Sequence, residues 1–578
     1  MKRRWFITKT NPEYVRYLSL AASISPLLAQ ILINRGVKTA DDINTFLNPG
    51  ITGLSDPFEL PGMRVAVDRI KAASRLRERV LIHGDYDTDG LTSAAIMIYA
   101  LKTIGMDVHC FIPNRMVHGY GFNAPSVDVA KKLGVKLIIT VDCGITSIDA
   151  ATRAKSEGID VIITDHHEPV RKTQACGLRA ELHDEFLLPD AVAIVNPKLT
   201  APRKPFADLS GAGVAFKIVQ AMAIDPDLSL GPEASLSLLD LAALGTIADV
   251  VPLVGENRVI IKEGLRCIGS AYRPGIRALM EVSGLGKKEM KAGLLSFTMV
   301  PRINAAGRIG DAGDVISLFL SGSDEETLSI AGRLDRINTE RQRIEEGVYQ
   351  EALSQLQAEG HDAAIVLQNE GWHTGVIGIV ASRLAEEFYR PAFIFTVDDT
   401  VAKGSIRSIP GFDVYDGLSQ CGDLLIAFGG HKQAAGVKLS VSNLPAFRER
   451  MNRIVTDFLK REDITPTLEI DAEVALSEVN AGLVRELSLL EPLGYGNPEP
   501  LFGSRRLGVL NPRVVGNNHI KMKLGQKSSS LDAIGFDMGK SFESLCAKTV
   551  DVVFTPMINE WNGGRYLQLH LKAFRASV

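Results

Sequence analysis

Short apolar runs alternate with longer amphipathic segments between about residues 66 and 200. The apolar runs span residues 80–82, 108–112, 136–141, 160–164 and 191–195. The segments between them, such as 91–104, place apolar residues at helical spacing. Strands that are apolar on both faces and alternate with helices are typical of a parallel sheet covered on both sides. We therefore expect an α/β domain with a parallel sheet.

The pattern changes elsewhere along the chain, and it predicts five parts. Residues 1–60 are predicted to be a helical extension, and 61–323 contain the parallel sheet. Residues 324–358 are rich in Glu, Arg, Gln and Leu without Pro, which indicates one long connecting helix. Residues 359–460 predict a smaller α/β domain. Residues 461–578 contain short alternating strands broken by Gly, Asn and Pro, which is typical of a small β-barrel.

Acidic and histidine side chains follow the carboxyl ends of the predicted strands or interrupt a later apolar run. In chain order they are Asp85, Asp87, Asp89, Asp142, Asp165, His166, His167 and Asp249. Ligands of parallel sheets bind beyond these strand ends. The alternative interpretations are that the first three aspartates form an ordinary Asp-rich turn, that His166 and His167 are structural, and that Asp249 caps a helix or lies in a turn.

Asp85, Asp87 and Asp89 alternate in one short loop, so their carboxylates are expected to repel one another, and a bound cation is the simplest relief. Carboxylates and imidazoles without thiolates suit Mn²⁺ or Mg²⁺ better than Zn²⁺. A carboxylate that bridges two such ions would make a two-metal centre for in-line displacement at phosphorus. The pattern therefore predicts phosphoester chemistry with two Mn²⁺ or Mg²⁺ ions as cofactors.

Composition adds little to this interpretation. A content of 46% hydrophobic and 23% charged residues is ordinary for a folded chain, and the net charge of −4 leaves a local basic groove possible. The six cysteines form no CxxC pair, which predicts neither a zinc cluster nor a disulfide framework and favours a reducing cytoplasm. We expect no signal peptide and no membrane helix.

Asp87-x-Asp89-Gly90 together with Asp165-His166-His167 resembles the DHH phosphoesterase superfamily. Further motifs resemble the RecJ family of single-strand-specific DNA exonucleases, from about residue 60 to the C-terminus. These motifs are Phe111–Arg115 with Gly119-Tyr120-Gly121, Arg302–Arg308, Gly371–Gly378, Gly404–Ser408 and Gly429–His431. The resemblance implies a DHH domain, a DHHA1 domain and an OB-type barrel.

The resemblance also implies roles for the acidic and histidine residues. The ions would be held by Asp87, Asp89, Asp142, His166 and Asp249, with Asp142 as the bridge. His167 would act catalytically beside them, together with Asp142 and His166. His83 and Asp85 match flanking metal-site positions, and a hydrogen-bonded histidine at a strand end is the alternative for His83.

A second set of residues is expected to bind the substrate. Arg302, Asn304 and Arg308 are predicted to lie in a Gly/Ala-rich loop, where arginine forks match phosphate oxygens. Ser405 and Arg407 resemble a pocket for a terminal 5′-phosphate. Arg115, His373 and the Gly-rich loop formed by Gly429, Gly430 and His431 are further expected members. In the barrel, the expected members are Lys521 on a strand and Trp561, which lies with Tyr566 in a predicted hairpin. Core packing is the alternative for Trp561 and Tyr566.

These features together predict a 5′→3′ exonuclease that degrades single-stranded DNA to mononucleotides, in DNA repair and recombination. Its expected partners are a DNA 5′ end, a helicase and a single-strand-binding protein, and we expect a cytoplasmic monomer. One alternative is an oligoribonuclease or cyclic-dinucleotide phosphodiesterase, which would lack the barrel. Others are a non-catalytic replication scaffold and a generic single-strand-binding protein. The segment 171–188 is longer than the usual family loop, and its role is open.

Overall fold

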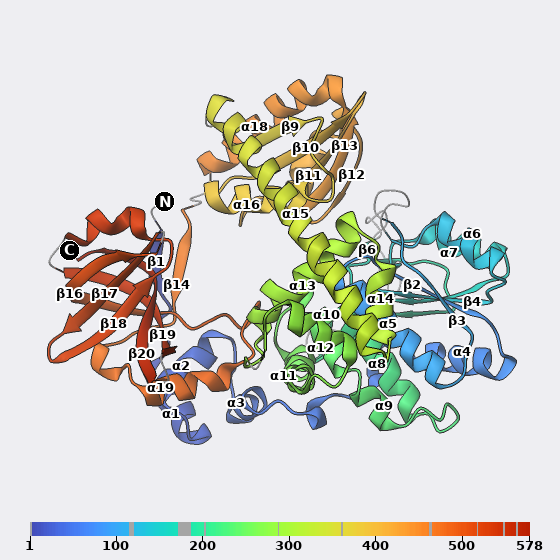
Figure 1. Ribbon diagram of the computed structural model, residues 1–578, viewed down its shortest axis with the longest axis horizontal. Helices are drawn as coiled ribbons and strands as arrows, with labels where there is room; N and C mark the ends of the chain where they lie inside the picture. Colours follow the sequence, from blue (N-terminus) through green and yellow to red (C-terminus); the bar gives the residue numbers. More distant parts are fainter. Residues whose placement is uncertain are drawn as a thin grey trace, which may run out of the picture. The chain divides into compact units, whose positions relative to one another are not determined.

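The computed structural model describes the chain except for residues 1–2, 115–120, 172–185, 201–203, 287, 360–361, 462–464, 517, 547–548, 562–563 and 578. The chain forms two compact units (Figure 1). One unit comprises Met1–Arg4, Pro301–Asp314 and Leu328–Thr467, and the other comprises Trp5–Val300, Val315–Thr327 and Leu468–Val578. The predicted metal ligands and the barrel belong to the second of these units.

The predicted parallel sheet is confirmed. Its order is β3-β2-β4-β5-β8 and all its pairings are parallel. The strands are β2 (Val80–Gly84), β3 (Val108–Phe111), β4 (Leu137–Val141), β5 (Asp160–Thr164) and β8 (Ala193–Val195). Because β3 and β4 lie on opposite sides of β2, the strand order reverses there, and such a reversal opens a crevice at the carboxyl edge.

Helices cover both faces of this sheet because its strands are apolar on both sides. On one face, Leu81, Ile138 and Val161 share a buried cluster with residues of α6 (Ala124–Lys132) and α7 (Ile148–Ser156). Two other helices, α5 (Thr88–Thr103) and α8 (Gly211–Ile224), contact β2–β5 and each other. Helix α10 (Leu239–Ala248) packs against α5 and α8, and α11 (Gly255–Ser270) packs against α10.

The other unit contains a mixed sheet with the order β12-β13-β11-β10-β9. Its strands are β9 (Ile365–Asn369), β10 (Ala392–Asp398), β11 (Val401–Arg407), β12 (Leu425–Gly430) and β13 (Ala434–Ser440). Helix α16 (Ile377–Phe388) and the long helix α15 (Asp324–Glu359) share a core with β9 and β10, whereas α17 (Val414–Ser419) and α18 (Leu444–Arg461) share another with β11 and β13. The expected single connecting helix is therefore present as α15.

The expected Gly-rich loop at Gly429 and Gly430 is wrong, because both residues end strand β12. Gly429 is paired with Gly436 of β13, and Gly430 is paired with Ala435. Glycine has a weak preference for strands, but the ladder of the neighbouring β13 overrides that preference. His431 follows the strand in the turn before β13 and is exposed.

The predicted C-terminal barrel is confirmed as a closed five-stranded barrel. Its strands are β16 (Phe502–Val515), β17 (His519–Gln526), β18 (Ser529–Gly535), β19 (Thr549–Trp561) and β20 (Gly564–Ala576). Strand β16 pairs with both β17 and β19, which closes the sheet on itself. Closure removes the exposed strand edges that would otherwise invite aggregation.

The N-terminal helices share one hydrophobic core with the barrel. Leu18, Leu28 and Leu32 pack in the same buried cluster as Phe502 and Phe554. The helices are α1 (Pro12–Ala22), α2 (Pro26–Asn34) and α3 (Ala40–Leu47). No single helix in the described part of the chain is long and apolar enough to cross a membrane, and α1 and α2, which pass that test only together, meet at 111°.

Arg258 of α11 joins three parts of this unit. Its guanidinium is buried against the Phe46 ring and donates hydrogen bonds to the Phe46 carbonyl at 2.7 Å and the Leu490 carbonyl at 3.0 Å. The remaining carbonyl acceptors are those of Leu489, Glu491 and Pro492. Burial lowers the pKa of Arg258 to about 10. One cation, the Arg258 guanidinium, therefore joins three parts of this unit by hydrogen bonds. They are helix α11, the end of α3 and the segment that leads into the barrel.

We expect Arg258→Ala to lower the free energy of unfolding by about 3 kcal/mol, because several buried carbonyl groups lose their donor. Arg266→Ala is the matched control. Arg266 is exposed on the same helix and binds only Glu263 among the described residues, so its loss is expected to cost less than about 0.5 kcal/mol. Thermal unfolding of both variants measures the difference, and equal melting temperatures would contradict the proposed joint.

Candidate metal centre and substrate-binding residues

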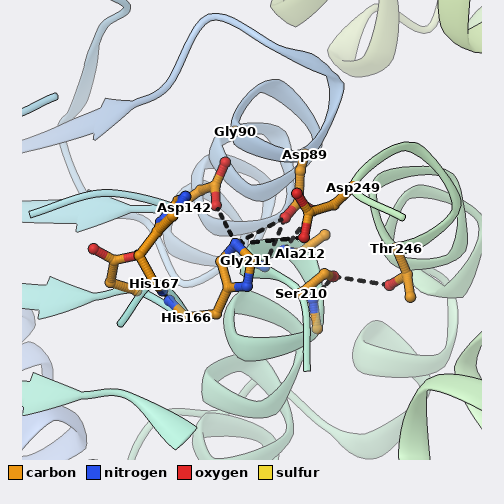
Figure 2. A network of polar contacts seen from close by, with 12 residues as sticks. Asp89, Gly90, Asp142, His166, His167, Ser210, Gly211, Ala212, Thr246 and Asp249 are labelled. Carbon is orange, nitrogen blue, oxygen red and sulfur yellow. Dashed lines mark hydrogen bonds and ion pairs between the residues drawn. The ribbon is translucent and has the colours of Figure 1, made fainter. Parts of the chain in front are cut away.

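The metal-ligand candidates include Asp89, Asp142, His166, His167 and Asp249, which lie together at the carboxyl edge of the parallel sheet (Figure 2). Asp85 and Asp87 follow β2, Asp142 follows β4, and His166 follows β5. Asp89 lies in the first turn of α5. Asp249 is the residue that ends α10, so its carboxylate is supplied by a helix C-terminus. Asp85 and Asp249, which are 164 positions apart in sequence, thus belong to one cluster near the point where the strand order reverses.

His166 is central to the cluster. Its Nε2 atom lies 3.1 Å from Asp142 Oδ1, 3.5 Å from Asp249 Oδ2 and 3.9 Å from Asp89 Oδ2. The ligand atoms form three overlapping groups in which all atoms lie within 4.8 Å of one another. The groups are Asp85–Asp87–Asp142, Asp89–His166–Asp249 and Asp142–His166–His167. Two groups share Asp142, which is the geometry that a bridging carboxylate requires.

Asp89 is fixed by the N-terminus of α8. Its two carboxylate oxygens accept hydrogen bonds from the backbone N–H groups of Gly211 at 2.7 Å and Ala212 at 2.9 Å. A Cβ atom at Gly211 would lie 2.5 Å from Asp142 Oδ1, and one at Gly245 would lie 2.6 Å from Asp89 Oδ1. Both glycines therefore leave room for the carboxylates, and the sequence analysis did not identify either of them.

Asp165 holds the two histidines in place, and it was not among the predicted site residues. Its Oδ1 atom accepts hydrogen bonds from the backbone N–H of His166 at 2.7 Å and of His167 at 3.1 Å. The same atom lies 2.7 Å from His167 Nδ1, while Oδ2 accepts from the Ile145 N–H at 2.9 Å. An acidic residue directly before a histidine pair at a strand end was the available signal.

Burial shifts the pKa values of these groups. Burial and the neighbouring carboxylates raise the pKa of Asp89 to about 7, that of Asp249 to about 9, and that of Asp142 well above its ordinary value. Burial lowers the pKa of His166 to about 3. Burial opposes the charge of His167 as well, but the hydrogen bond that His167 donates to the Asp165 carboxylate, together with the charge of Asp165, outweighs it and raises the pKa of His167 to about 9.

The donor set fits divalent cations. Asp142 Oδ1 and His166 Nε2 are buried and make no hydrogen bond within the described residues, although they lie 3.1 Å apart. A neutral imidazole lone pair facing a carboxylate oxygen is unfavourable unless a proton or cation lies between them. Oxygen and imidazole ligands without a thiolate suit Mn²⁺ or Mg²⁺.

His83 lies apart from the three ligand groups. It is fully buried within β2, where its ring stacks 5.7 Å from Phe111 and 5.4 Å from Phe122. Burial lowers the pKa of His83 to about 4, so the imidazole is neutral. Its proposed contact with an ion stays a prediction.

The expected loop at Arg302, Asn304 and Arg308 is wrong, because all three residues lie in helix α13 (Ala292–Ile309). Alanine is the strongest helix former, and the run of alanines sustains the helix past Pro301. Arg302 Nε lies 2.9 Å from Asp335 Oδ1, and Arg308 donates to the Gly375 carbonyl at 3.0 Å.

Ser405 and Arg407 lie beside the N-terminus of α16. A Cβ atom at Gly378 would lie 2.9 Å from Ser405 Oγ and 3.5 Å from Arg407 Nη2. His373 Nδ1 accepts a hydrogen bond from the Gly375 N–H at 3.0 Å, just before the helix. Among the described residues no side-chain hydrogen bond caps this helix start, where the backbone N–H groups of Ile377 and Ile379 bond to the carbonyls of His373 and Val376.

The glycine-rich segment meets Ser405 through the sheet. Gly436 of β13 is paired with Ser405 on one side and with Gly429 on the other. A Cβ atom at Gly429 or Gly436 would meet nothing within 4 Å, so this row is open to a ligand backbone. Ser405, Arg407, His373 and Gly429 all belong to the unit that contains Leu328–Thr467, and their role in substrate binding stays a prediction.

The remaining substrate residues lie in the barrel or outside the described residues. Lys521 of β17 is paired with Arg513 of β16, and Lys523 follows on the same face. Trp561 closes the β19–β20 hairpin opposite Gly564, and the nearby Tyr566 is 57% exposed, which is contrary to core packing. Arg115 lies outside the described residues, as does the segment 171–188 between Arg171 and Phe186.

Three family profiles match the chain. The DHH family, N-terminal domain matches residues 79–246, the DHHA1 domain matches 361–457, and the RecJ OB domain matches 470–573. The first match contains all the metal-ligand candidates except Asp249, which lies three residues beyond its end, as 249 − 246 gives.

Several proteins that are similar along nearly the whole chain carry the name RecJ. The single-stranded-DNA-specific exonuclease RecJ of Bacillus subtilis (strain 168) is 39% identical over 99% of this chain and 70% of its own length. That of Salmonella typhimurium is 35% identical over 95% of this chain and 96% of its own length. The crystal structure of RecJ from Thermus thermophilus with Mn²⁺ matches 100% of this chain and 80% of its own length, with a TM-score of 0.84 and 33% identity. The structure of the same protein with Mg²⁺ matches 100% of this chain and 79% of its own length, with a TM-score of 0.78 and 31% identity.

We expect the chelated protein to become less stable between pH 7 and pH 9. The raised pKa values of Asp249 and His167, both about 9, mean that the folded state keeps protons that the unfolded chain has released by pH 7. Stability falls with pH wherever the folded state binds more protons. Thermal unfolding in a chelator at pH 7, 8 and 9 measures this fall.

Saturating Mn²⁺ is expected to raise the melting temperature, and to raise it more at pH 9, because fewer protons must then be displaced. Asp142→Asn should lose this gain, whereas Asp149→Asn, at an exposed position on α7, should keep it. An equal gain in both variants would contradict the assignment of Asp142 to the centre.

Proposed function

The chain belongs to the RecJ family of single-stranded-DNA-specific exonucleases, and on that premise we propose that it is a metal-dependent exonuclease that degrades single-stranded DNA in the 5′→3′ direction to mononucleotides. The cluster of Asp142, His166 and their neighbouring carboxylates is the observation that carries the proposal. The similarity of nearly the whole chain to RecJ proteins supports the substrate. DNA repair and recombination is the corresponding role.

Two Mn²⁺ or Mg²⁺ ions are the proposed cofactors. Asp85 and Asp87 would hold one ion and Asp89, His166 and Asp249 the other, with Asp142 contributing to both. When bound, such a pair activates water and stabilises the charge of the attacked phosphoryl group. The absence of a side chain at Gly211 and Gly245 leaves room for the carboxylates of Asp142 and Asp89.

His167 is the proposed catalytic proton carrier. Its side chain is 31% exposed, whereas that of His166 is 10% exposed, so substrate can reach it. With a pKa of about 9 in the absence of ions, the His167 imidazole is protonated near neutral pH and can donate a hydrogen bond to a phosphate oxygen or a proton to the departing 3′-oxygen. Asp165 holds the ring through Nδ1.

The unit that contains Leu328–Thr467 supports the proposed direction of degradation. Ser405 Oγ and the Arg407 guanidinium lie beside Gly378 at the start of α16, and a hydroxyl and a guanidinium together suit a terminal phosphate. Docking of a 5′-phosphate before cleavage would enforce both exonuclease action and polarity. Arg308, His373 and Gly429 would line the path of the adjoining nucleotide.

The described ligands argue against a non-catalytic scaffold, and the barrel argues against an enzyme restricted to dinucleotides. The partners proposed here are single-stranded DNA, a helicase and a single-strand-binding protein, and the protein is proposed to act as a cytoplasmic monomer. A comparison of long single-stranded DNA with dinucleotides and cyclic dinucleotides tests the substrate. Faster hydrolysis of the dinucleotides would overturn the proposal.

Asp142→Asn is expected to reduce the rate of nucleotide release from end-labelled single-stranded DNA at least about 10³-fold, because the bridge between the two ions is lost. Its melting temperature in chelator should not fall, since the substitution removes a buried repulsion. Asp149→Asn is the matched control and should retain the wild-type rate. Near-normal cleavage by Asp142→Asn would exclude the cluster as the active site.

We further expect 5′-phosphorylated single strands to be degraded faster than 5′-hydroxyl strands. Arg407→Ala should abolish this preference, at a cost of about tenfold to a hundredfold in kcat/KM for the phosphorylated strand, because a charge-assisted contact is lost. Arg453→Ala, in an exposed ion pair on α18, is the control. A preference that survives in Arg407→Ala would place the end-binding site elsewhere.

A further inference from the structure

The residue after Asp249 has a strained backbone. Val250 adopts a left-handed conformation with a φ of 59°. β-Branched residues rarely adopt this conformation, because the branches crowd the backbone. The Val250 side chain is 63% exposed, so burial does not offset the strain. Such conformations persist where the surrounding structure imposes them, and they concentrate at functional sites.

The turn Gly494–Asn497, which precedes the barrel, holds this loop. Leu253 donates its backbone N–H to the Tyr495 carbonyl at 2.8 Å. A Cβ atom at Gly494 would lie 2.7 Å from Leu253 Cδ1, and one at Gly496 would lie 2.9 Å from Pro252 Cβ. The close approach of the two loops therefore requires both glycines.

The turn itself is rigid. Gly494 and Asn497 exchange two backbone hydrogen bonds, at 2.9 and 3.1 Å. The Asn497 side chain is fully buried, and its Nδ2 atom donates to the carbonyls of Leu490 and Pro492 at 2.7 Å each. Arg258 binds the same two carbonyls. These hydrogen bonds hold the turn in one conformation, so the residue at its tip has a fixed position.

Tyr495 stands at that tip, and its side chain is 63% exposed. Three residues separate its hydrogen-bond partner Leu253 from Asp249, so the backbones of these two residues lie at most about 14 Å apart. At about 3.4 Å per stacked nucleotide, this span corresponds to about four nucleotides of a single strand. A turn with an exposed aromatic ring is thus bound to the loop that follows Asp249, on the segment that continues into the barrel.

We infer that Tyr495 is a substrate-positioning residue that stacks on a base of the single strand, on the 3′ side of the linkage being cleaved. This inference rests on the proposed exonuclease function. Every base offers an aromatic face, so such a contact accepts any sequence. It also requires an unpaired base, since the bases of a duplex already stack within the helix. The stacked ring would fix the position of the single-stranded DNA along its path between the barrel and the metal centre.

Steady-state kinetics test the inference. Tyr495→Ala is expected to raise KM for single-stranded DNA about tenfold with little change in kcat, because one stacking contact is lost before the chemical step. Tyr495→Phe keeps the ring and should keep the wild-type KM. Tyr17→Ala is the matched control, since Tyr17 on α1 is also 63% exposed. An unchanged KM in Tyr495→Ala would overturn the inference.

A binding measurement separates this inference from the proposed activity. Oligonucleotides with 2-aminopurine at successive positions from the 5′ end are bound in chelator, where cleavage does not proceed. Stacking on Tyr495 should quench the fluorescence at one position in the wild type and in Tyr495→Phe, but not in Tyr495→Ala. An identical quenching profile in wild type and Tyr495→Ala would overturn the stacking. A failure of the wild type to degrade single strands with Mn²⁺ would instead overturn the proposed function.

Discussion

The mutual repulsion of buried carboxylates at one sheet edge is the constraint on which the rest of the structure depends. Asp89, Asp142 and Asp249 lie around one imidazole and are all withdrawn from water, so their pKa values rise far above the ordinary range. Such a cluster is unfavourable unless cations or protons neutralise it. The fold therefore supplies stability from elsewhere, and it holds the carboxylates in the arrangement that two divalent ions require.

Several rigid elements impose this arrangement. The N-terminus of α8 binds Asp89, Asp165 fixes the two histidines, and Gly211 and Gly245 leave room for the carboxylates. Both Asp89 oxygens accept these backbone hydrogen bonds, and each carboxylate oxygen keeps a further lone pair for a cation. The cost of assembling like charges is thus distributed over backbone N–H groups and tight packing.

The same unit connects the cluster to the barrel. Arg258 joins α11 to the segment before the barrel, and the Gly494–Asn497 turn binds the loop that follows Asp249. Single-stranded DNA bound to the barrel would therefore pass the rigid Gly494–Asn497 turn on its way to the metal centre. The proposed stacking on Tyr495 uses this rigidity, because a base placed by a mobile loop would not set the register of cleavage.

The sequence by itself determined the parallel sheet, the long helix, the barrel and the acidic cluster, because apolar periodicity and strand-end carboxylates are local signals that the fold preserves. It failed where a neighbour decides the outcome. The segment around Arg302 became helix because alanine preference outweighed Gly307 and Pro301, and Gly429 and Gly430 became strand because β13 pairs with them. Only the tertiary structure identified Gly211 and Gly245, since their roles are defined by carboxylates far away in sequence. The contact between the Asp249 loop and the barrel turn likewise joins residues more than 240 positions apart, as 495 − 253 shows, and no local pattern encodes it.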